Sequence, residues 1–426
     1  MALGGGTFTT QNKVLPGAYI NVISAAGSVV TMGERGTVAL PIALNWSKSG
    51  VFTVTADEFQ KDSMKIFGYS YTADEMQALR EVFKHAQKVV VYNLNDNGGA
   101  AATCTYATAK CTGTRGNDLK LVIQKNIDNT DKFDVTLYMG TSIVYQQTVA
   151  TVAELGENAF VTWADTELAV TAGTTFSGGT NGTCDAQSYQ NALNAFESYT
   201  FNVLVCPDSA TYGTLYVEYT KRMRDKRGIK FQLVCVDVDA DYKGVISLDP
   251  AQANALYWVA GAQAGCEINK SCTNKIYDGE LTIDTPHTQT ELETCILSGV
   301  FAFHKVDDEV RVLMDINTFV TFTDDEGEIF AHNQTVRVCD QRHNDVKRIF
   351  NKKYLGNIQN DSDGRASFWG DVVALSDQYA QMRAIEPYDS KSLTIEIGDK
   401  PTDVVGRDYI RIIGTMEKLY MTIVCN

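Results

Sequence analysis

The apolar runs Tyr199-Thr-Phe-Asn-Val-Leu-Val-Cys206 and Ile229-Lys-Phe-Gln-Leu-Val-Cys-Val-Asp237 decide the fold of this 426-residue chain. Each run is short and rich in aromatic and β-branched residues, which predicts a buried strand. A helix-like stretch, Thr214–Arg227, lies between them. Strands that alternate with helices predict an α/β sheet that is parallel at least in part.

The same alternation extends in both directions from these two runs. Upstream, the pattern Thr72-Ala-Asp-Glu75 predicts a capping box at the start of a helix. Downstream, Phe319–Thr323 and Glu328–Ala331 predict a hairpin. The remaining predicted strands are Thr37–Leu44, Lys88–Leu94, Val245–Leu248, Glu280–Ile283, Phe301–Val306 and Val310–Ile316, and the remaining predicted helices are Tyr189–Phe196, Gln252–Ala264 and Gln289–Ser298.

An all-β stretch interrupts this α/β pattern between two Gly-rich segments. The segments begin at Asn95 and Thr171, and we interpret both as flexible linkers. Between them, alternating apolar residues predict short strands at 119–123, 133–137 and 143–149. We therefore expect residues 97–185 to form a peripheral β domain inserted into a host domain, removable at little cost to the host core.

The two ends of the chain are β-rich, but neither is expected to form a stable sheet by itself. Residues 1–24 hold one short apolar strand, Ala18–Ile23, and bury too little to form a domain. Near the other end, helix-like runs at 336–354 and 368–382 precede two β-rich pieces, Ser392–Ile397 and Tyr409–Val424. A hydrophobic strand at a terminus must join a sheet in its own chain or in a neighbour. This requirement indicates assembly.

The composition of the chain limits the classes of partner that it is expected to bind. The chain carries a net charge of -15, which disfavours nucleic acid and anionic membranes, because phosphate binding needs concentrated Lys and Arg. Hydrophobic residues make up 44% of the chain, enough for two or three domains. We expect no membrane span and no signal peptide, since no apolar run is long enough and the first residues have no basic region.

The cysteines predict neither disulfides nor a metal site. The ten cysteines are scattered, and most lie in apolar runs, where a thiol behaves as a small hydrophobe. Cys104 with Cys111, and Cys266 with Cys272, could be zinc half-sites, but neither pair has the required spacing. We expect no metal and no cofactor.

The search for catalytic residues is equally negative. Asp237-Val-Asp-Ala-Asp241 begins like an EF-hand loop, but Tyr242 and Leu248 occupy the positions that need Gly and Glu. A turn at a strand end is the better interpretation. The five histidines are dispersed and lack a nearby nucleophile motif, so we expect no catalytic residue.

Basic residues gather in two stretches of this acidic chain, Lys221–Gly228 and Arg342–Lys353. Each is either a solvated helix face or a patch that meets an acidic surface of a neighbour. In the second stretch, the helical spacing of Val346, Ile349, Phe350 and Tyr354 predicts an apolar stripe. The opposite face would carry the candidate contact residues Lys347, Arg348, Lys352 and Lys353.

Several separated motifs, in one order, resemble the contractile tail sheath proteins of phages and phage tail-like bacteriocins. Gly6–Val22 resembles the N-terminal arm of the Gram-positive myophage sheath group, and Gly33–Pro41 its first core strand. Trp258–Gly279 resembles the middle-domain signature, and Val336–Gly356 with Asn360 and Gly364-Arg365 the C-terminal domain. Residues 97–185 carry no such signature.

The resemblance implies a structural subunit and no enzyme. Such subunits stack as hexameric rings around an inner tube, contract to drive that tube through the target envelope, and meet baseplate and tail terminator proteins. The particle is made in the host cytoplasm and released on lysis. The arms are expected to add strands to neighbouring subunits through Ala18, Tyr19, Ile20, Asn21, Val22, Ile23, Tyr409, Ile410, Arg411, Ile412, Ile413, Leu419, Tyr420, Met421, Thr422 and Ile423.

The expected fold class is a multidomain α+β or α/β protein with a discontinuous mixed-sheet core, an inserted all-β domain and extended β arms. Two other functions remain open, an α/β enzyme with residues 97–185 as a β lid and a non-contractile tube or shell protein. The expected divisions are an N-terminal arm at 1–24, a first core part at 25–96, the inserted domain at 97–185, an α/β middle part at 186–318, a C-terminal domain at 319–406 and a C-terminal arm at 407–426.

Overall fold

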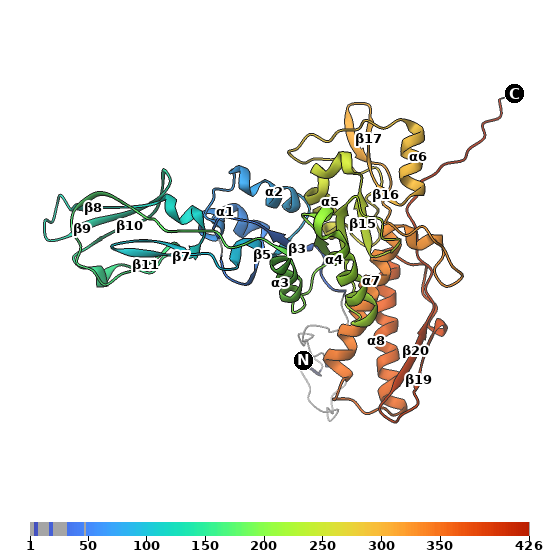
Figure 1. The fold of residues 1–426 in the computed structure, drawn as a ribbon. Coiled ribbons are helices and arrows are strands. Elements are labelled where there is room, and N and C mark those ends of the chain that lie inside the picture. Colours follow the sequence, from blue (N-terminus) through green and yellow to red (C-terminus); the bar gives the residue numbers. More distant parts are fainter. Residues whose placement is uncertain (1–3, 7–16, 20–31, 47, 426) are drawn as a thin grey trace. The chain divides into compact units, whose positions relative to one another are not determined.

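The computed structural model describes residues 4–6, 17–19, 32–46 and 48–425 (Figure 1). The chain divides into two compact units, and each is described by itself. The larger unit comprises Gly33–Asn344 and Ile412–Asn426, and the smaller unit comprises Met1–Met32 and Asp345–Arg411. Among the described residues, no helix has both the length and the apolar character needed to cross a membrane.

A seven-stranded sheet forms the centre of the larger unit, in the order β16-β15-β14-β13-β3-β5-β4. Neighbouring strands are parallel except for β4, which pairs with β5 in the antiparallel sense. The parallel α/β sheet predicted from the alternating pattern is therefore confirmed. Its strands are β3 (Thr37–Ile42), β4 (Val51–Thr55), β5 (Lys88–Asn93), β13 (Val203–Val205), β14 (Gln232–Val236), β15 (Val245–Leu248) and β16 (Val300–Phe301).

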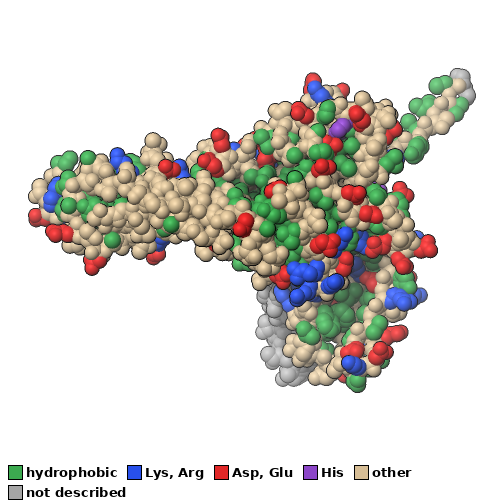
Figure 2. All heavy atoms as spheres, in the orientation of Figure 1, with side chains coloured by type: hydrophobic (Ala, Val, Ile, Leu, Met, Phe, Trp, Pro, Cys, Tyr) green, Lys and Arg blue, Asp and Glu red, His purple; other side chains and the backbone are tan. Residues whose placement is uncertain are grey.

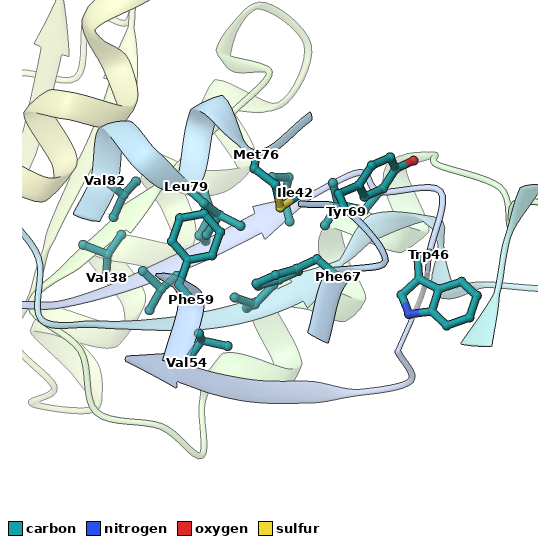
Figure 3. Close-up of a cluster of buried hydrophobic side chains, with 14 of the residues drawn as sticks. Val38, Ile42, Trp46, Val54, Phe59, Phe67, Tyr69, Met76, Leu79 and Val82 are labelled. Atoms are coloured by element: carbon teal, nitrogen blue, oxygen red, sulfur yellow. The ribbon is translucent and has the colours of Figure 1, made fainter. Parts of the chain in front are cut away.

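Alternate residues of these strands bury opposite faces of the sheet. Val38 and Leu40 of β3 join one hydrophobic cluster, and Ala39 between them joins another. The first cluster includes side chains of α1 (Ala56–Phe67), α2 (Gln77–Phe83) and α5 (Leu256–Gly265), and the second those of α3 (Ala186–Phe196) and α4 (Ser209–Lys221). Helices thus cover both faces of the sheet, as parallel sheets require. In Figure 3, Phe59, Leu79 and Val82 point toward Val38.

Three predicted strand segments of the larger unit are wrong, and in two of them side-chain acceptors bind backbone donors. Phe319–Thr323 forms no strand, because the Asp241 carboxylate accepts the amide hydrogens of Val320 and Thr321 at 2.8 and 3.0 Å. Glu328–Ala331 is a 3₁₀ turn, so the predicted hairpin does not form. Glu280–Ile283 also forms no strand, and the hydroxyl of Tyr277 accepts the amide hydrogen of Leu281 at 3.2 Å. Side-chain acceptors take donors that a strand ladder would need.

The helix caps also differ from the prediction. The capping box predicted at Thr72 does not form; a 3₁₀ turn, Asp74–Met76, whose N-cap Ala73 makes no side-chain bond, precedes α2. A reciprocal capping box lies instead at Thr55 and Glu58, at the start of α1. Beyond the central sheet, β17 (Phe303–Val306) and β18 (Glu309–Val312) form a hairpin, and α6 spans Gln289–Leu297.

The inserted stretch is all-β, as predicted. It contains a four-stranded sheet in the order β10-β9-β8-β12 and a three-stranded sheet in the order β11-β7-β6. In β8, Leu119, Leu121 and Ile123 are buried while Lys120 is exposed, which is the alternation seen in the sequence. The strands are β6 (Ala101–Cys104), β7 (Ala107–Thr112), β8 (Leu119–Lys125), β9 (Phe133–Met139), β10 (Ser142–Val149), β11 (Val161–Trp163) and β12 (Thr171–Thr175).

The Gly-rich borders of the insertion are not free linkers, and this part of the prediction is wrong. The amides of Gly182 and Thr183 donate to the carbonyls of Asn95 and Asn97, both at 2.9 Å. A Cβ at Gly182 would lie 2.4 Å from both carbonyl oxygens. Glycine is therefore needed here for close backbone approach rather than for flexibility. The two border segments are paired with each other.

The smaller unit is built on α8 (Ser362–Gln381), which buries Phe368, Val372, Leu375 and Tyr379 at the predicted helical spacing. Helix α7 (Asn333–Ile349) contributes its last residues to this unit. The hairpin of β19 (Leu393–Ile397) and β20 (Val404–Asp408) follows, and Trp369 of α8 donates its indole hydrogen to the carbonyl of Leu393 at 3.1 Å. Near the N-terminus, β1 (Gly4–Gly6) and β2 (Gly17–Tyr19) pair in parallel.

A buried ion pair connects α7 to the larger unit's interior. Arg337 and Asp315 lie 2.8 Å apart, and each side chain is 1% exposed. Burial by itself raises the pKa of the Asp315 carboxyl, but Arg337, the amide of Cys272 and the side chain of Gln263 together hold that pKa below its usual range. The carboxylate is thus charged and fully hydrogen-bonded, the condition under which a buried charge is tolerated.

Replacing residues 97–185 with a short Gly/Ser linker should preserve assembly but weaken the larger unit. Trp46 is 1% exposed, and its ring lies 6.4 Å from that of Phe160 in the insertion. Uncovering Trp46 should cost about 1.5–3 kcal/mol in the free energy of unfolding. Denaturant unfolding measures this loss, and adding Trp46→Ser to the linker variant is the control for exposed surface. Loss of cylinders from a folded variant would show that the insertion is a subunit interface.

Arg337→Met should lower the free energy of unfolding at neutral pH by about 3–5 kcal/mol, because it leaves Asp315 buried without its cation. Without the cation, burial raises the pKa of the Asp315 carboxyl, so the deficit should begin to shrink above the ordinary pKa of Asp, about 3.9, and should continue to shrink as the pH falls further. Urea unfolding at several pH values measures both effects. The double variant Arg337→Met with Asp315→Asn should recover part of the lost free energy of unfolding. If the deficit changes neither with pH nor with the second substitution, the charge argument is refuted.

Candidate assembly surfaces

The C-terminal segment is extended, and it departs from the predicted strand Tyr409–Val424. Strand β20 ends at Asp408, and residues 409–425, all described, form no strand apart from a single bridge residue at Ile412. The neighbouring strands β19 and β20 are already paired with each other. Within the described part of the chain, this segment thus has β-type sequence but forms no ladder beyond the bridge at Ile412.

Its first residues are held within the smaller unit. The amide of Tyr409 donates to the carbonyl of Ser392 at 3.2 Å, and the amide of Glu386 donates to the carbonyl of Arg411 at 2.8 Å. The guanidinium of Arg411 also lies 3.7 Å from the Glu386 carboxylate, but both side chains are exposed. Ile410 is half-buried. Of the predicted arm residues, Tyr409, Ile410 and Arg411 thus have local contacts.

Two further anchors hold the segment within the larger unit. The side-chain amide of Gln334 makes both bonds of the first anchor. Its Nε2 donates to the backbone carbonyl of Ile413, and its Oε1 accepts from the backbone amide of Thr415, both at 3.0 Å. The carboxylate of Glu417 accepts from the hydroxyl of Thr273 at 2.9 Å. Sequence reasoning missed Gln334 and Glu417, because one glutamine in a helix and one glutamate in a β-type run carry no pattern that marks them as anchors.

Large hydrophobic side chains follow the last anchor and lie in solvent. Leu419 is 82% exposed, Tyr420 89% and Ile423 73%. Figure 2 shows hydrophobic side chains along this segment, which ends at the C-terminus marked in Figure 1. Met421 and Thr422 are exposed as well. A contiguous exposed apolar segment of this kind is a candidate interaction site.

The predicted N-terminal arm residues are only partly described. Ala18 and Tyr19 lie in β2, paired with Gly5 and Gly6 of β1. Ile20, Asn21, Val22 and Ile23 lie outside the described residues.

The β19–β20 hairpin has two open edges. Among the described residues, each of these strands pairs only with the other. Ile397 of β19 is 54% exposed and Val405 of β20 is 57% exposed. A two-stranded sheet is marginal by itself in water, and an open edge offers unpaired backbone groups to another strand.

The basic helix differs from the prediction in shape and in charge. Helix α7 ends at Ile349, and a π-turn, Phe350–Tyr354, replaces the predicted continuation. Ile349 and Tyr354 are buried as predicted, whereas Val346 and Phe350 are only half-buried. The π-turn inserts an i to i+5 bond, from the amide of Leu355 to the carbonyl of Phe350 at 2.9 Å, and so shifts the helical register.

Two of the four basic residues have acidic partners in the same unit. Arg348 lies 2.9 Å from Asp345, and Lys353 lies 2.7 Å from Asp371. The hydrogen bond to Asp371 raises the pKa of Lys353. Lys347 and Lys352 are exposed. The predicted face is therefore not uniform, because Arg348 and Lys353 are paired with carboxylates of the same unit.

The other basic stretch, 221–228, is partly paired within the larger unit, whereas Lys226 and Arg227 are exposed. Arg224 is 2% exposed and forms a bidentate pair with Asp340. Arg222 lies 2.9 Å from Glu197. Much of the positive charge that seemed available from the sequence is therefore neutralised inside the larger unit.

Four family models match successive parts of the chain. Residues 35–94 match the domain III N-terminal region of tail sheath protein Gp18, and residues 97–181 match the phage tail sheath protein beta-sandwich domain. Residues 182–318 match the phage tail sheath protein central domain, and residues 325–426 match the phage tail sheath C-terminal domain.

Individual proteins agree with these matches. The chain is 33% identical over 385 residues to the phage-like element PBSX protein XkdK of Bacillus subtilis, covering 81% of this chain and 82% of that protein. The crystal structure of the sheath tail protein from Desulfitobacterium hafniense has 34% identity and a TM-score of 0.79, covering 95% of this chain and 99% of that one. The helical sheath of the anti-feeding prophage in its contracted state, with 10% identity and a TM-score of 0.55 over 97% and 99% of the two chains, shares the fold. The chain therefore belongs to the family of phage tail sheath proteins and is a structural subunit of a contractile tail sheath.

Proposed function

We propose that this subunit polymerises around an inner tail tube as stacked hexameric rings and that its contraction drives the tube through the envelope of a target cell. The observation that carries the proposal is the C-terminal segment, anchored at Gln334 and Glu417 and then exposing Leu419, Tyr420 and Ile423. The role is mechanical and needs no catalytic centre. Baseplate and tail terminator proteins would close the two ends of the tube-bound assembly.

The two terminal arms link the subunits by strand addition. Residues 18–23 and parts of 409–424 supply β-type sequence, and the open edges of the β19–β20 hairpin supply places for such strands to pair. Each main-chain hydrogen bond contributes about 0.5–1.5 kcal/mol, and one added strand makes several. Links of this kind hold while subunits slide, because backbone pairing is independent of how the folded bodies are oriented.

In this proposal, six segments of the chain have distinct structural roles. An arm at 1–24 and an arm at 407–426 connect subunits, while 25–96 and 186–318 form the core. The inserted β domain, 97–185, is peripheral, and the C-terminal domain, 319–406, carries the hairpin that receives arms. The paired borders of the insertion, at Asn95–Gly182, support a domain that leaves and re-enters the core at one place. The sheath would be made in the host cytoplasm and released with the particle on lysis.

Electron microscopy of the negatively stained protein separates this function from its alternatives. Hollow striated cylinders support a sheath, discrete globules would favour an α/β enzyme with a β lid, and closed shells would favour a capsid-like protein.

Substituting Met421→Pro together with Thr422→Pro should abolish cylinders while leaving the subunit folded. Successive residues of a strand point their N–H groups to opposite sides, so one of two adjacent prolines removes a ladder donor in either register. Both residues are exposed, so the fold should not change. Electron microscopy measures cylinder formation, and denaturant unfolding curves check that the variant subunit is folded.

The matched control for the proline pair is Met421→Ala with Thr422→Ala, which removes the side chains and keeps both donors. It should assemble better than the proline pair. Equal assembly of the two variants would show that this part of the arm does not act through its backbone. Deleting residues 1–24 should likewise give a folded monomer that fails to assemble.

Lys347→Glu with Lys352→Glu should weaken assembly most at low salt. We propose that these exposed lysines face an acidic surface of a neighbouring subunit or of the tube. Exposed pairs contribute only about 0–1 kcal/mol each, so the effect should be small and should fade as salt screens the charges. Sedimentation of assembled sheath across a salt series measures it.

Arg348→Glu with Lys353→Glu is the contrasting variant. It would place new carboxylates beside Asp345 and Asp371, so it should destabilise the subunit itself. If the first pair assembles normally at every salt concentration, Lys347 and Lys352 make no contact that assembly requires.

A further inference from the structure

Asp249, His287 and Cys295 come together in the larger unit although the histidines are dispersed in the sequence. One ligand atom from each lies within 4.8 Å of the others. His287 Nε2 is 3.1 Å from Asp249 Oδ2, and Cys295 Sγ is 3.9 Å from the same oxygen. Sequence reasoning missed this group because 38 residues separate Asp249 from His287 and no spacing motif joins them.

Three different elements present these side chains. Asp249 follows β15 directly, and its amide donates to the carbonyl of Phe301 at 3.0 Å, so the carboxylate is fixed at the edge of the central sheet. Its Oδ1 accepts the amide hydrogen of Ala251 at 2.8 Å, which leaves Oδ2 for the group. His287 precedes α6, and Cys295 lies on that helix.

The distances fit a tetrahedral zinc site. Zinc binds nitrogen and oxygen at about 2.0–2.2 Å and sulfur at about 2.3 Å, so a tetrahedron would place N and O about 3.3–3.5 Å apart and S and O about 3.5–3.7 Å apart. The observed 3.1 and 3.9 Å differ from these edges by a few tenths of an ångström. Mixed sulfur, nitrogen and oxygen ligands suit zinc better than calcium or magnesium.

Two independent observations point to a bound ion. First, His287 Nε2 is buried from solvent and makes no hydrogen bond, even though the Asp249 oxygen is close. A buried nitrogen that has a carboxylate nearby but makes no hydrogen bond is unfavourable, and a metal would satisfy it. Second, none of the nine residues of α6 is buried. Its apolar residues Leu292 and Ile296 are only half-buried, so apolar packing by itself holds this helix weakly.

We propose that Asp249, His287 and Cys295 bind one zinc ion, which clips α6 to the edge of the central sheet. A neutral His287 donates through Nε2, Asp249 through Oδ2, and Cys295 through its thiolate. Two negative ligands balance the dication, and a water molecule completes the tetrahedron. Burial, followed by the Asp249 carboxylate, raises the pKa of the free Cys295 thiol, so binding releases its proton to solvent.

Cobalt(II) titration of the full-length protein tests the site. The protein is stripped with a chelator, kept reduced with a phosphine, and titrated with Co²⁺ alone, which gives a sulfur-to-cobalt charge-transfer band when a thiolate binds. One equivalent should bind with this band, and zinc should displace it. Cys295→Ser should lose the band, and His287→Gln should weaken binding at least about tenfold while leaving the thiol in place.

Cys184→Ser is the matched control, because Cys184 is an exposed cysteine outside the group. It should keep the band and the affinity of the natural sequence. Zinc should also raise the melting temperature of the unsubstituted protein and not that of His287→Gln. No band in the unsubstituted protein, or a band that survives in Cys295→Ser, would overturn the proposal.

Discussion

The buried pair of Arg337 and Asp315 is the constraint on which the rest of the larger unit depends. Arg337 also donates to Gln263 of α5 and to the carbonyl of Lys270, while Asp315 accepts from Asn333, the first residue of α7. One charge pair thus fixes the start of α7 against α5 and the loop after it. Because a buried pair is tolerated only with good geometry and several hydrogen bonds, displacing any of these elements would leave a charge in the core without its partners.

The position of the C-terminal arm follows from that constraint. Gln334 is next to Asn333, and it holds the arm backbone through both its amide nitrogen and its amide oxygen. Thr273, whose hydroxyl donates to Glu417 and accepts from the amide of Asp315, ties a second point of the arm to the same network. The arm is therefore hydrogen-bonded to the larger unit as far as Glu417. The residues beyond Glu417 are the ones that expose large hydrophobic side chains.

The periodic elements were predictable from the sequence, and the elements that depend on tertiary hydrogen bonds were not. Strands β3, β5 and β15 lie close to their predicted positions, and α8 contains most of its predicted run but begins earlier, at Ser362, because burial on both faces, or on one stripe, leaves a clear pattern. The hairpin expected at 319–331 failed because Asp241, far away in sequence, captures the amides of Val320 and Thr321. The linker interpretation of the Gly-rich borders failed because composition does not distinguish flexibility from close packing.

The same limit explains the basic residues. Sequence showed two positive stretches, but could not show that Asp340, Glu197, Asp345 and Asp371 would neutralise Arg224, Arg222, Arg348 and Lys353. The chain has a net charge of -15, and much of its positive charge is paired internally. Copies of the chain therefore repel one another electrostatically. Backbone pairing does not depend on side-chain charge and resists this repulsion, whereas exposed ion pairs would be too weak to do so alone. We therefore expect strand addition to contribute more than charge to holding the assembly together.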